Sequence, residues 1–159
     1  MPKKIRVCLG GTFDPLHDGH KALLEKAFEV ARGGEVLIGL TSDKMARKRR
    51  RLVLSFAVRS ENLQQYIRRN FSKEVRIVEL NDAYGLTLSE DFDFIVVSPE
   101  TLPVARKINR IRKERGMKPV EIAEVGYVLA EDGGVTSSTR IKKGEIDKHG
   151  AVLTKIYRR

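Results

Sequence analysis

Two of the three histidines in the chain stand three residues apart, close behind a pair of glycines, in the stretch LGGTFDPLHDGH of residues 9–20. An imidazole can donate a hydrogen bond or bind a metal, so a closely spaced pair indicates a chemical site. Gly10 and Gly11 directly follow an apolar run, and without side chains they allow close approach of a ligand and a positive φ. The spacing fits neither the dinucleotide-binding GxGxxG pattern nor the GxxxxGK[ST] phosphate loop.

A helix is expected to begin near Asp18, where the unpaired N–H groups and the helix dipole favour an anion. His17 precedes the first turn and His20 lies within it, so the two rings can converge on one pocket. Gly19 leaves space against the backbone, and the Thr12 hydroxyl can add a further donor. The motif therefore predicts a phosphate-binding site made of backbone N–H groups, a hydroxyl and two imidazoles.

Two other interpretations of the histidine pair stay open. A histidine on a helix is often a surface residue or a core residue with satisfied hydrogen bonds. Two histidines three residues apart could also bind zinc with Asp14 or Asp18 as a further ligand, although no cysteine or third histidine stands near in the sequence. We therefore favour phosphate binding and expect no protein metal site.

The stretch TSSTRIKKGEID of residues 136–147 combines several donors for phosphate oxygens. Ser137 or Ser138 can cap a helix, and Thr139 adds a hydroxyl. Arg140 offers a planar guanidinium that can bind two phosphate oxygens at once. The alternative is a plain helix start with an exposed arginine, and the first motif favours phosphate binding over it.

Apolar runs of strand length alternate with longer segments of helical period. Strands are expected at residues 5–11, 35–42, 74–80, 93–98 and 120–128. Helices are expected at residues 18–34, 55–71 and 101–116, with short ones at 137–144 and 150–159. This alternation predicts an α/β, Rossmann-like doubly wound parallel sheet of about five strands, in a single domain over residues 1–159. Ligands bind such sheets beyond the carboxyl ends of the strands, where GGTFDPLH, TSDK, NDAYG and SPET fall.

The chain has 31 Lys and Arg against 21 Asp and Glu, a net charge of +10, which suits anionic partners. Much of the excess lies in KMARKRRR, residues 44–51, which is either a solvated loop or helix start or part of a binding site. The basic runs lack interleaved aromatics, so no nucleic-acid partner is expected. No apolar run reaches the ~18 residues that span a bilayer, so no membrane partner is expected. The single cysteine, Cys8, excludes an internal disulfide and favours a cytoplasmic location.

The stretch GGTFDPLHDGH resembles the signature of the nucleotidyltransferase superfamily, whose HxGH motif is read here as residues 17–20. In that superfamily the histidines bind the triphosphate of ATP or CTP and stabilise the pentacoordinate transition state at the α-phosphorus. The resemblance implies a Rossmann-like fold, in agreement with the order of elements. It also implies a catalytic role for His17 and His20. The residues it implies for ATP binding here are Gly10, Gly11, Thr12, Phe13, His17, Gly19 and His20.

Residues 136–147 resemble the second signature of the superfamily, written ISSTxxR or ISST(R/K)IR. The residues it implies for contact with the triphosphate are Ser137, Ser138, Thr139 and Arg140. The chain departs from the usual pattern at Thr136, where an aliphatic residue is common. It departs again at Lys142 or Lys143, where a second arginine often lies.

Between the motifs, GLTSDK and IVVSPETLPVARKINRIRKERG are similar to the archaeal type of phosphopantetheine adenylyltransferase, and the resemblance covers nearly the whole chain. It implies transfer of AMP from ATP to 4′-phosphopantetheine, giving 3′-dephospho-CoA and pyrophosphate in coenzyme A biosynthesis. Lys44 is the best match to the family's catalytic lysine near the phosphates, and Lys48 is the second choice. With Thr12, these lysines are also implied for binding of the acceptor. The residues implied for the adenosine side, at a strand end, are Ser98, Glu100 and Thr101.

The same resemblance leaves two further points. Asn109 and Arg110 belong to the pattern of this branch, either in the site or as support for their helix. A Mg²⁺ ion is expected on the ATP triphosphate, held mostly by phosphates and waters. A glycerol-3-phosphate cytidylyltransferase and an archaeal FAD synthetase carry a similar first motif, and they are the alternatives within the superfamily.

Overall fold

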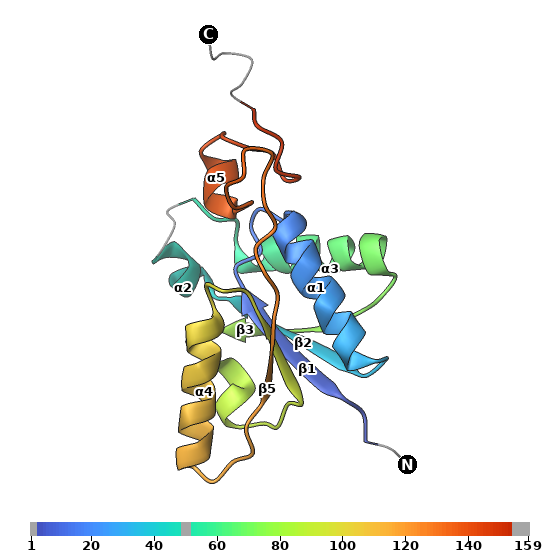
Figure 1. The fold of residues 1–159 in the computed structure, drawn as a ribbon, viewed down its shortest axis with the longest axis vertical. Helices are drawn as coiled ribbons and strands as arrows, with labels where there is room; N and C mark the ends of the chain where they lie inside the picture. The colour runs from blue at the N-terminus through green and yellow to red at the C-terminus, as the bar shows by residue number, and fades with distance from the viewer. Residues whose placement is uncertain (1–2, 49–51, 154–159) are drawn as a thin grey trace.

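The five predicted strands form one parallel sheet in the order β3-β2-β1-β4-β5, in a computed structural model that describes residues 3–48 and 52–153 (Figure 1). The strands are β1 (Arg6–Gly11), β2 (Glu35–Thr41), β3 (Arg76–Leu80), β4 (Phe94–Val97) and β5 (Glu121–Glu124). The helices are α1 (Asp18–Ala31), α2 (Asp43–Arg47), α3 (Phe56–Phe71), α4 (Leu102–Glu114) and α5 (Ser138–Lys142), with a 3₁₀ helix at Gly85–Leu88. The predicted α/β class and five-stranded parallel sheet are confirmed.

The direction in which strands are added to the sheet reverses at β1. The strands β2 and β3 lie on one side of it, and β4 and β5 lie on the other. In a parallel sheet the carboxyl ends of all strands meet at one edge, and ligands bind where the order reverses. The loop between β1 and α1, which carries the first motif, therefore opens at this switch point.

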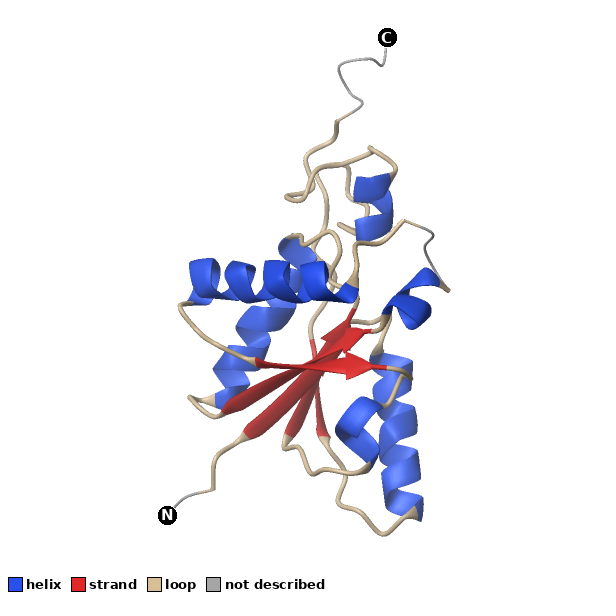
Figure 2. Ribbon diagram, turned by 180° about the vertical axis from the view of Figure 1, so that it is seen from behind, coloured by secondary structure: helices blue, strands red, loops and turns tan. Residues whose placement is uncertain are grey.

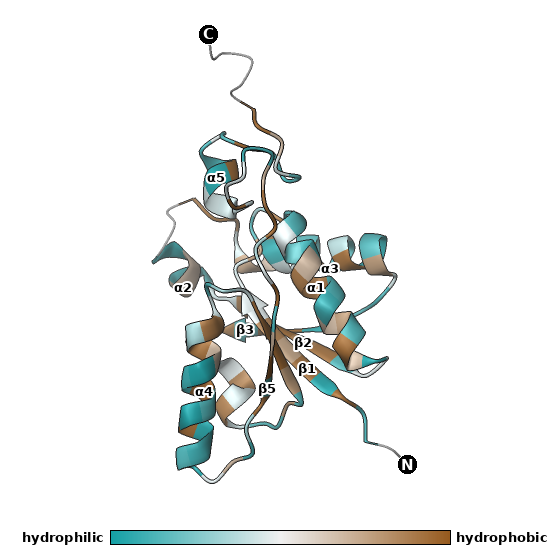
Figure 3. Cartoon of the chain, in the orientation of Figure 1, coloured by the Kyte–Doolittle hydropathy of each residue, from teal (hydrophilic) through white to brown (hydrophobic). Residues whose placement is uncertain are grey.

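Helices cover both faces of the sheet, as Figure 2 shows. The buried residues on one face include Val7, Leu9 and Ile38 from the strands, Leu24 and Ala27 from α1, and Leu63 and Ile67 from α3. Those on the other face include Cys8, Leu37 and Ile95 from the strands and Ala105 and Ile108 from α4. In Figure 3 the strands are mostly brown, whereas the outer side of α4 is teal. Burial on both faces explains why the central strands β1, β2 and β4 are mostly apolar, whereas the edge strands β3 and β5 carry charged residues.

Two segments differ from the expectations. The start of the basic run forms the short helix α2, and the last three residues of that run lie outside the described ones. The helix expected over residues 150–159 is wrong for its described part, 150–153, where Val152 forms an antiparallel bridge with Ile146. Within the described part of the chain, no helix is long and apolar enough to cross a membrane.

The burial of Cys8 gives a first prediction. Burial raises the pKa of the Cys8 thiol to about 12. Because the thiolate is the reactive form, we expect iodoacetamide at pH 8 to alkylate the folded protein at least about a hundredfold more slowly than the urea-unfolded protein. Mass spectrometry of timed samples measures both rates. Equal rates would contradict the position of β1 between the two helical layers.

Candidate active site

The two histidines of the first motif cap the start of α1 and bond to each other. The His17 ring accepts a hydrogen bond at Nδ1 from the Gly19 N–H, 3.0 Å away, and the His20 ring accepts one at Nδ1 from the His17 N–H, 3.2 Å away. This is a capping box built from imidazoles in place of the usual hydroxyl and carboxylate. The two rings stack with their centroids 3.8 Å apart and their planes 29° from parallel. The structure therefore brings the two rings together, as their spacing predicts.

The capping hydrogen bonds fix which nitrogen of each ring carries a proton. A nitrogen that accepts a hydrogen bond has no proton, so Nδ1 of His17 and Nδ1 of His20 are both unprotonated. The neutral form of each ring then carries its proton on Nε2. The stacked pair therefore carries two Nε2–H groups, and N–H groups of this kind can donate hydrogen bonds to phosphate oxygens.

The backbone N–H groups at the start of α1 are not the phosphate donors that the sequence predicts. The His17 N–H and the Gly19 N–H are bonded to the two rings, and the Asp18 N–H donates to the Lys148 carbonyl oxygen at 3.0 Å. The space beside Gly19 is also filled, because a Cβ there would lie 2.7 Å from Cε1 of His17. An anion at this end of α1 must therefore be bound mainly through side chains.

Phe13 supports the histidine pair from the preceding loop. Its ring is buried and lies 4.8 Å from the His20 ring, centroid to centroid. The positive φ that the sequence allows at the glycines occurs here instead, with φ of 53° at Phe13. Gly11 makes room for this conformation, since a Cβ there would lie 3.1 Å from the Phe13 ring. A bulky residue in the left-handed region is strained, and such strain is typical of loops that position functional groups.

The acidic residues considered as metal ligands have protein partners. Asp14 accepts a hydrogen bond from the Leu54 N–H at 2.9 Å and lies 3.6 Å from Nζ of Lys142. Asp18 lies 3.0 Å from Nδ1 of the third histidine, His149. Among the residues that the structure describes, no three His, Cys, Asp or Glu side chains are grouped to hold a metal ion. The zinc alternative therefore finds no ligand set there.

The second motif packs directly against the first. Ser137 caps α5 by accepting a hydrogen bond from the Arg140 N–H at 3.2 Å. Ser138 is buried, and its hydroxyl donates to the Pro15 carbonyl oxygen at 3.2 Å. In Figure 1, α5 lies beyond the start of α1, at the same end of the molecule as the carboxyl ends of the strands. The two motifs, more than 100 residues apart in sequence, thus form one site.

Arg140 is bonded to groups of its own C-terminal segment. Its guanidinium forms ion pairs with Asp132 and with Glu145, where Nε lies 3.0 Å from the carboxylate, and it also donates to the Val135 carbonyl oxygen. The hydrogen bond from Arg140 holds the pKa of Asp132 below its usual value, and Asp132 in turn raises the pKa of Arg140. The predicted phosphate fork is thus bonded within the C-terminal segment, and its contact with ATP stays a prediction.

The remaining predicted residues lie around the same edge of the sheet. Lys44 and Lys48 are exposed, on α2 and just after it, beyond the carboxyl end of β2. Ser98 follows β4, and its N–H donates to the Thr101 hydroxyl at 3.1 Å. Glu100, between them, is exposed. Thr139 is exposed in the first turn of α5. The lysines thus follow the end of β2, and Ser98 and Glu100 follow the end of β4. The ligand contacts of all these residues stay predictions.

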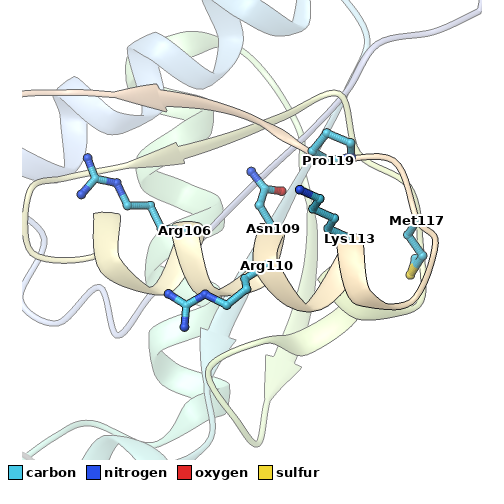
Figure 4. A pocket seen from close by; sticks show the side chains of 6 residues that line it. All are labelled: Arg106, Asn109, Arg110, Lys113, Met117 and Pro119. Carbon is cyan, nitrogen blue, oxygen red and sulfur yellow. The ribbon is translucent and has the colours of Figure 1, made fainter.

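A pocket of about 570 Å³ lies along α4 and the loop that follows it (Figure 4). The residues that line it are Arg106, Asn109, Arg110, Lys113, Met117 and Pro119. Asn109 exchanges two hydrogen bonds of 2.8 Å with the backbone of Val120 and so joins α4 to the start of β5. No residue of either motif lines this pocket, and the hydrogen bonds of Asn109 make it a support of α4, whereas Arg110 is exposed beside it.

Arg59 is a residue of the site that the motifs do not identify. Its side chain is fully buried, and Nη1 lies 3.4 Å from the Thr12 carbonyl oxygen. The available signal was its position four residues before Leu63 and eight before Ile67, on the buried face of α3. Lys, Glu, Arg and Asp are almost never fully buried unless they are paired, so an arginine in an apolar stripe marks a specific set of partners.

The sequence is similar to known proteins over most of its length. The sequence model of the cytidylyltransferase-like family matches residues 8–144, which include the first motif and residues 136–144 of the second. The chain is 49% identical to the phosphopantetheine adenylyltransferase of Archaeoglobus fulgidus, over 94% of this chain and 100% of that protein. It is 55% identical to the phosphopantetheine adenylyltransferase of Methanosarcina mazei, over 94% of this chain and 96% of that protein.

Solved structures show the same fold. A protein of unknown function from Archaeoglobus fulgidus is 48% identical, with a TM-score of 0.72 over 76% of this chain and 89% of that one. A lipopolysaccharide core biosynthesis protein from Thermoplasma volcanium, at 19% identity and a TM-score of 0.60 over 76% of this chain and 95% of that one, shares the fold alone. The paired histidines lie within the residues that the family model matches. The chain therefore belongs to the cytidylyltransferase-like family and, within it, to the phosphopantetheine adenylyltransferases.

Proposed function

We propose that the protein transfers AMP from ATP to 4′-phosphopantetheine, which forms 3′-dephospho-CoA and releases pyrophosphate. The observation that carries the proposal is the stacked pair of His17 and His20 at the start of α1, in a chain of this family. We place the reaction in the cytoplasm, in keeping with a single cysteine that is buried as a thiol.

The chemistry of the reaction explains why the site holds donors rather than a strong base. The acceptor is a phosphate monoester that is largely ionised at pH 7, so it attacks the α-phosphorus without a general base. The bond from its oxygen to the α-phosphorus forms as the bond from that phosphorus to the pyrophosphate oxygen breaks. The main obstacle is the in-line approach of two anionic groups, so catalysis depends on positioning and on positive potential.

Each predicted residue then has a task that its chemistry can perform. The Nε2–H groups of His17 and His20 donate to the triphosphate, and His20 acts at the α-phosphate, where negative charge builds in the transition state. Lys44, with Lys48 as the second choice, and the Thr12 hydroxyl bind the acceptor phosphate. The net charge of +10 attracts both anionic substrates.

ATP enters this reaction as its magnesium complex. The ion is held mostly by phosphate oxygens and waters, which is usual for Mg²⁺ on a nucleotide. Asp14 and Asp18 have partners elsewhere, and the described residues group no carboxylates around the histidine pair as a metal site. The residues near the triphosphate are therefore expected to bind its oxygens directly.

A panel of substrates tests the proposal. Pyrophosphate release is measured with ATP or CTP as donor and with 4′-phosphopantetheine, glycerol 3-phosphate or FMN as acceptor. We expect release only with ATP and 4′-phosphopantetheine, together with 3′-dephospho-CoA identified by mass spectrometry. Release with CTP and glycerol 3-phosphate, or with ATP and FMN, would instead assign the chain to one of the alternatives within the superfamily.

The ion pairs of Arg140 give a prediction about ATP binding. To reach phosphate oxygens, its guanidinium must leave Asp132. We expect Arg140→Ala to weaken ATP binding about tenfold, the loss expected for a charge-assisted pair, with a smaller effect on turnover. Isothermal titration calorimetry with a non-hydrolysable ATP analogue measures the affinity.

Asp132→Asn is the matched variant, because it loosens the same segment while it releases the guanidinium. We expect Asp132→Asn to strengthen ATP binding, since the competing carboxylate is removed. An unchanged ATP affinity in Arg140→Ala would count against the second motif. Equal weakening in both variants would show that Arg140 acts only through the stability of the C-terminal segment.

A further inference from the structure

Arg59 is held entirely inside the protein by groups from four different segments. Its Nε donates to the Leu54 carbonyl oxygen at 2.8 Å, and its Nη2 lies 3.1 Å from Oδ1 of Asp43. Its Nη1 donates to the Thr41 hydroxyl at 3.1 Å and to the Thr12 carbonyl oxygen at 3.4 Å. These partners come from the loop after β1, the end of β2, the start of α2 and the segment before α3.

The partners of Arg59 belong to the segments that carry the predicted substrate-binding residues. Thr12 is itself one of those residues, and Asp43 directly precedes Lys44 at the start of α2. Asp43 also accepts a hydrogen bond from the Phe56 N–H at 2.7 Å. The pKa of Asp43 lies below its usual value: burial opposes this shift, but the hydrogen bonds from Arg59 and Phe56 outweigh it. One buried cation thus joins the two strand ends next to the switch point.

The hydrogen bonds also have a direction. The Thr41 hydroxyl accepts from Arg59, and it donates its own proton to the Thr12 hydroxyl oxygen at 2.9 Å. A hydroxyl has one proton and two lone pairs, so Thr12 accepts from Thr41 and keeps its own proton for another acceptor. An arginine cannot accept a hydrogen bond, so the Arg59–Thr41 step has one direction, and the Thr41 hydroxyl continues it by donating to Thr12.

We propose that Arg59 is a positioning residue that acts through Thr41, so that the Thr12 hydroxyl serves as a donor to a substrate phosphate oxygen. The inference rests on the proposed function, because the Thr12 hydroxyl would donate this hydrogen bond to the phosphate of 4′-phosphopantetheine or to the triphosphate of ATP. Without Arg59 or the Thr41 hydroxyl, the Thr12 proton can turn inward and the substrate loses a donor. Loss of a hydrogen bond to a charged group typically lowers a binding or rate constant about tenfold or more.

Variants at Thr41 test the chain of hydroxyls without removing the buried charge. Thr41→Val keeps the shape of the side chain but removes the hydroxyl, and we expect kcat to fall about tenfold or more while KM for ATP changes less than about threefold. Thr41→Ser keeps the hydroxyl, and we expect it to retain kcat within about twofold. A kcat in Thr41→Val close to that of the wild type, or equal losses in both variants, would overturn the proposal.

Arg112 provides the matched control for Arg59. It too is fully buried in a helix, and its guanidinium bonds to the Thr87, Glu90 and Lys118 carbonyl oxygens and to Asp91, none of which belongs to the candidate site. We expect Arg59→Lys and Arg112→Lys both to lower the unfolding temperature, and only Arg59→Lys to lower kcat when both are assayed folded. Equal kcat losses would overturn the proposal. If the wild type itself showed no adenylyl transfer, the proposed function would fail instead.

Discussion

Replacement of His20 by alanine is expected to lower turnover by about a hundredfold to a thousandfold, the effect of removing one donor to charge that develops in a transition state. ATP affinity is expected to change less than about threefold. The reason is that the Nε2–H of His20 interacts with the α-phosphate most strongly when negative charge has built up there. Steady-state kinetics give the turnover, and calorimetry with a non-hydrolysable ATP analogue gives the affinity.

The structure requires a second variant at this position, because the His20 ring also accepts the hydrogen bond from the His17 N–H. Loss of this cap alone costs about 1 kcal/mol of stability. His20→Gln separates the two roles, since glutamine is a usual capping-box residue at the third helical position. We expect His20→Gln to unfold close to the wild-type temperature and still to lose turnover as His20→Ala does. Equal losses of turnover and ATP affinity in both variants would contradict the transition-state role.

The sequence predicted the layout of the fold because its strongest signals are local. Buried parallel strands read as apolar runs, and helices such as α1 show their buried face as a periodic stripe. The position of the first motif at the carboxyl end of a strand followed from that alternation, whereas the reversal of strand order at β1 is seen only in the structure. The convergence of His17 and His20 was predictable for the same reason, since residues at the edge of a first helical turn share one side of it.

The contacts that the sequence did not predict are those between distant segments. Nothing near Arg140 in the sequence indicated that Asp132 and Glu145 would bind its guanidinium, because that pairing depends on how the C-terminal segment folds back. The N–H groups at the start of α1 were expected to face a phosphate, but the histidine rings and the Lys148 carbonyl oxygen bond to them. Hydrogen-bond donors therefore identify a candidate site, whereas their partners are decided by tertiary structure.

The glycine pair after α1 shows the same difference between what the local sequence indicates and what tertiary contacts decide. In the sequence, Gly33 and Gly34 both read as helix-ending residues, yet the structure uses them differently. Gly33 has a φ of 82° and open space around it, so it serves the turn itself. Gly34 lies where the chain passes the start of β1: a Cβ there would stand 2.1 Å from the Ile5 carbonyl oxygen and 2.9 Å from that of Ala31. Both atoms belong to the backbone, so neither can move aside alone.

Gly34→Ala is therefore expected to destabilise the protein by about 3 kcal/mol, at the upper end of the usual cost of overpacking. For a chain of this size the unfolding temperature would fall by roughly 10 °C, as measured by circular dichroism. The Glu35 N–H bonds to the same Ile5 carbonyl oxygen at 2.9 Å, so the added methyl group also strains the first contact between β1 and β2.

Gly126→Ala is the matched control for Gly34→Ala, because Gly126 has open space around it and no positive φ. We expect a change below about 0.5 kcal/mol there. Gly33→Ala tests the effect of backbone conformation alone, because Gly33 has a positive φ but no close neighbour. We expect this substitution to cost about 1 kcal/mol, between the values for the other two variants. If Gly34→Ala were no more destabilising than Gly33→Ala, the two glycines would be equivalent. The close passage of Gly34 against the backbone of Ile5, just before β1, would then not limit the size of the residue at this position.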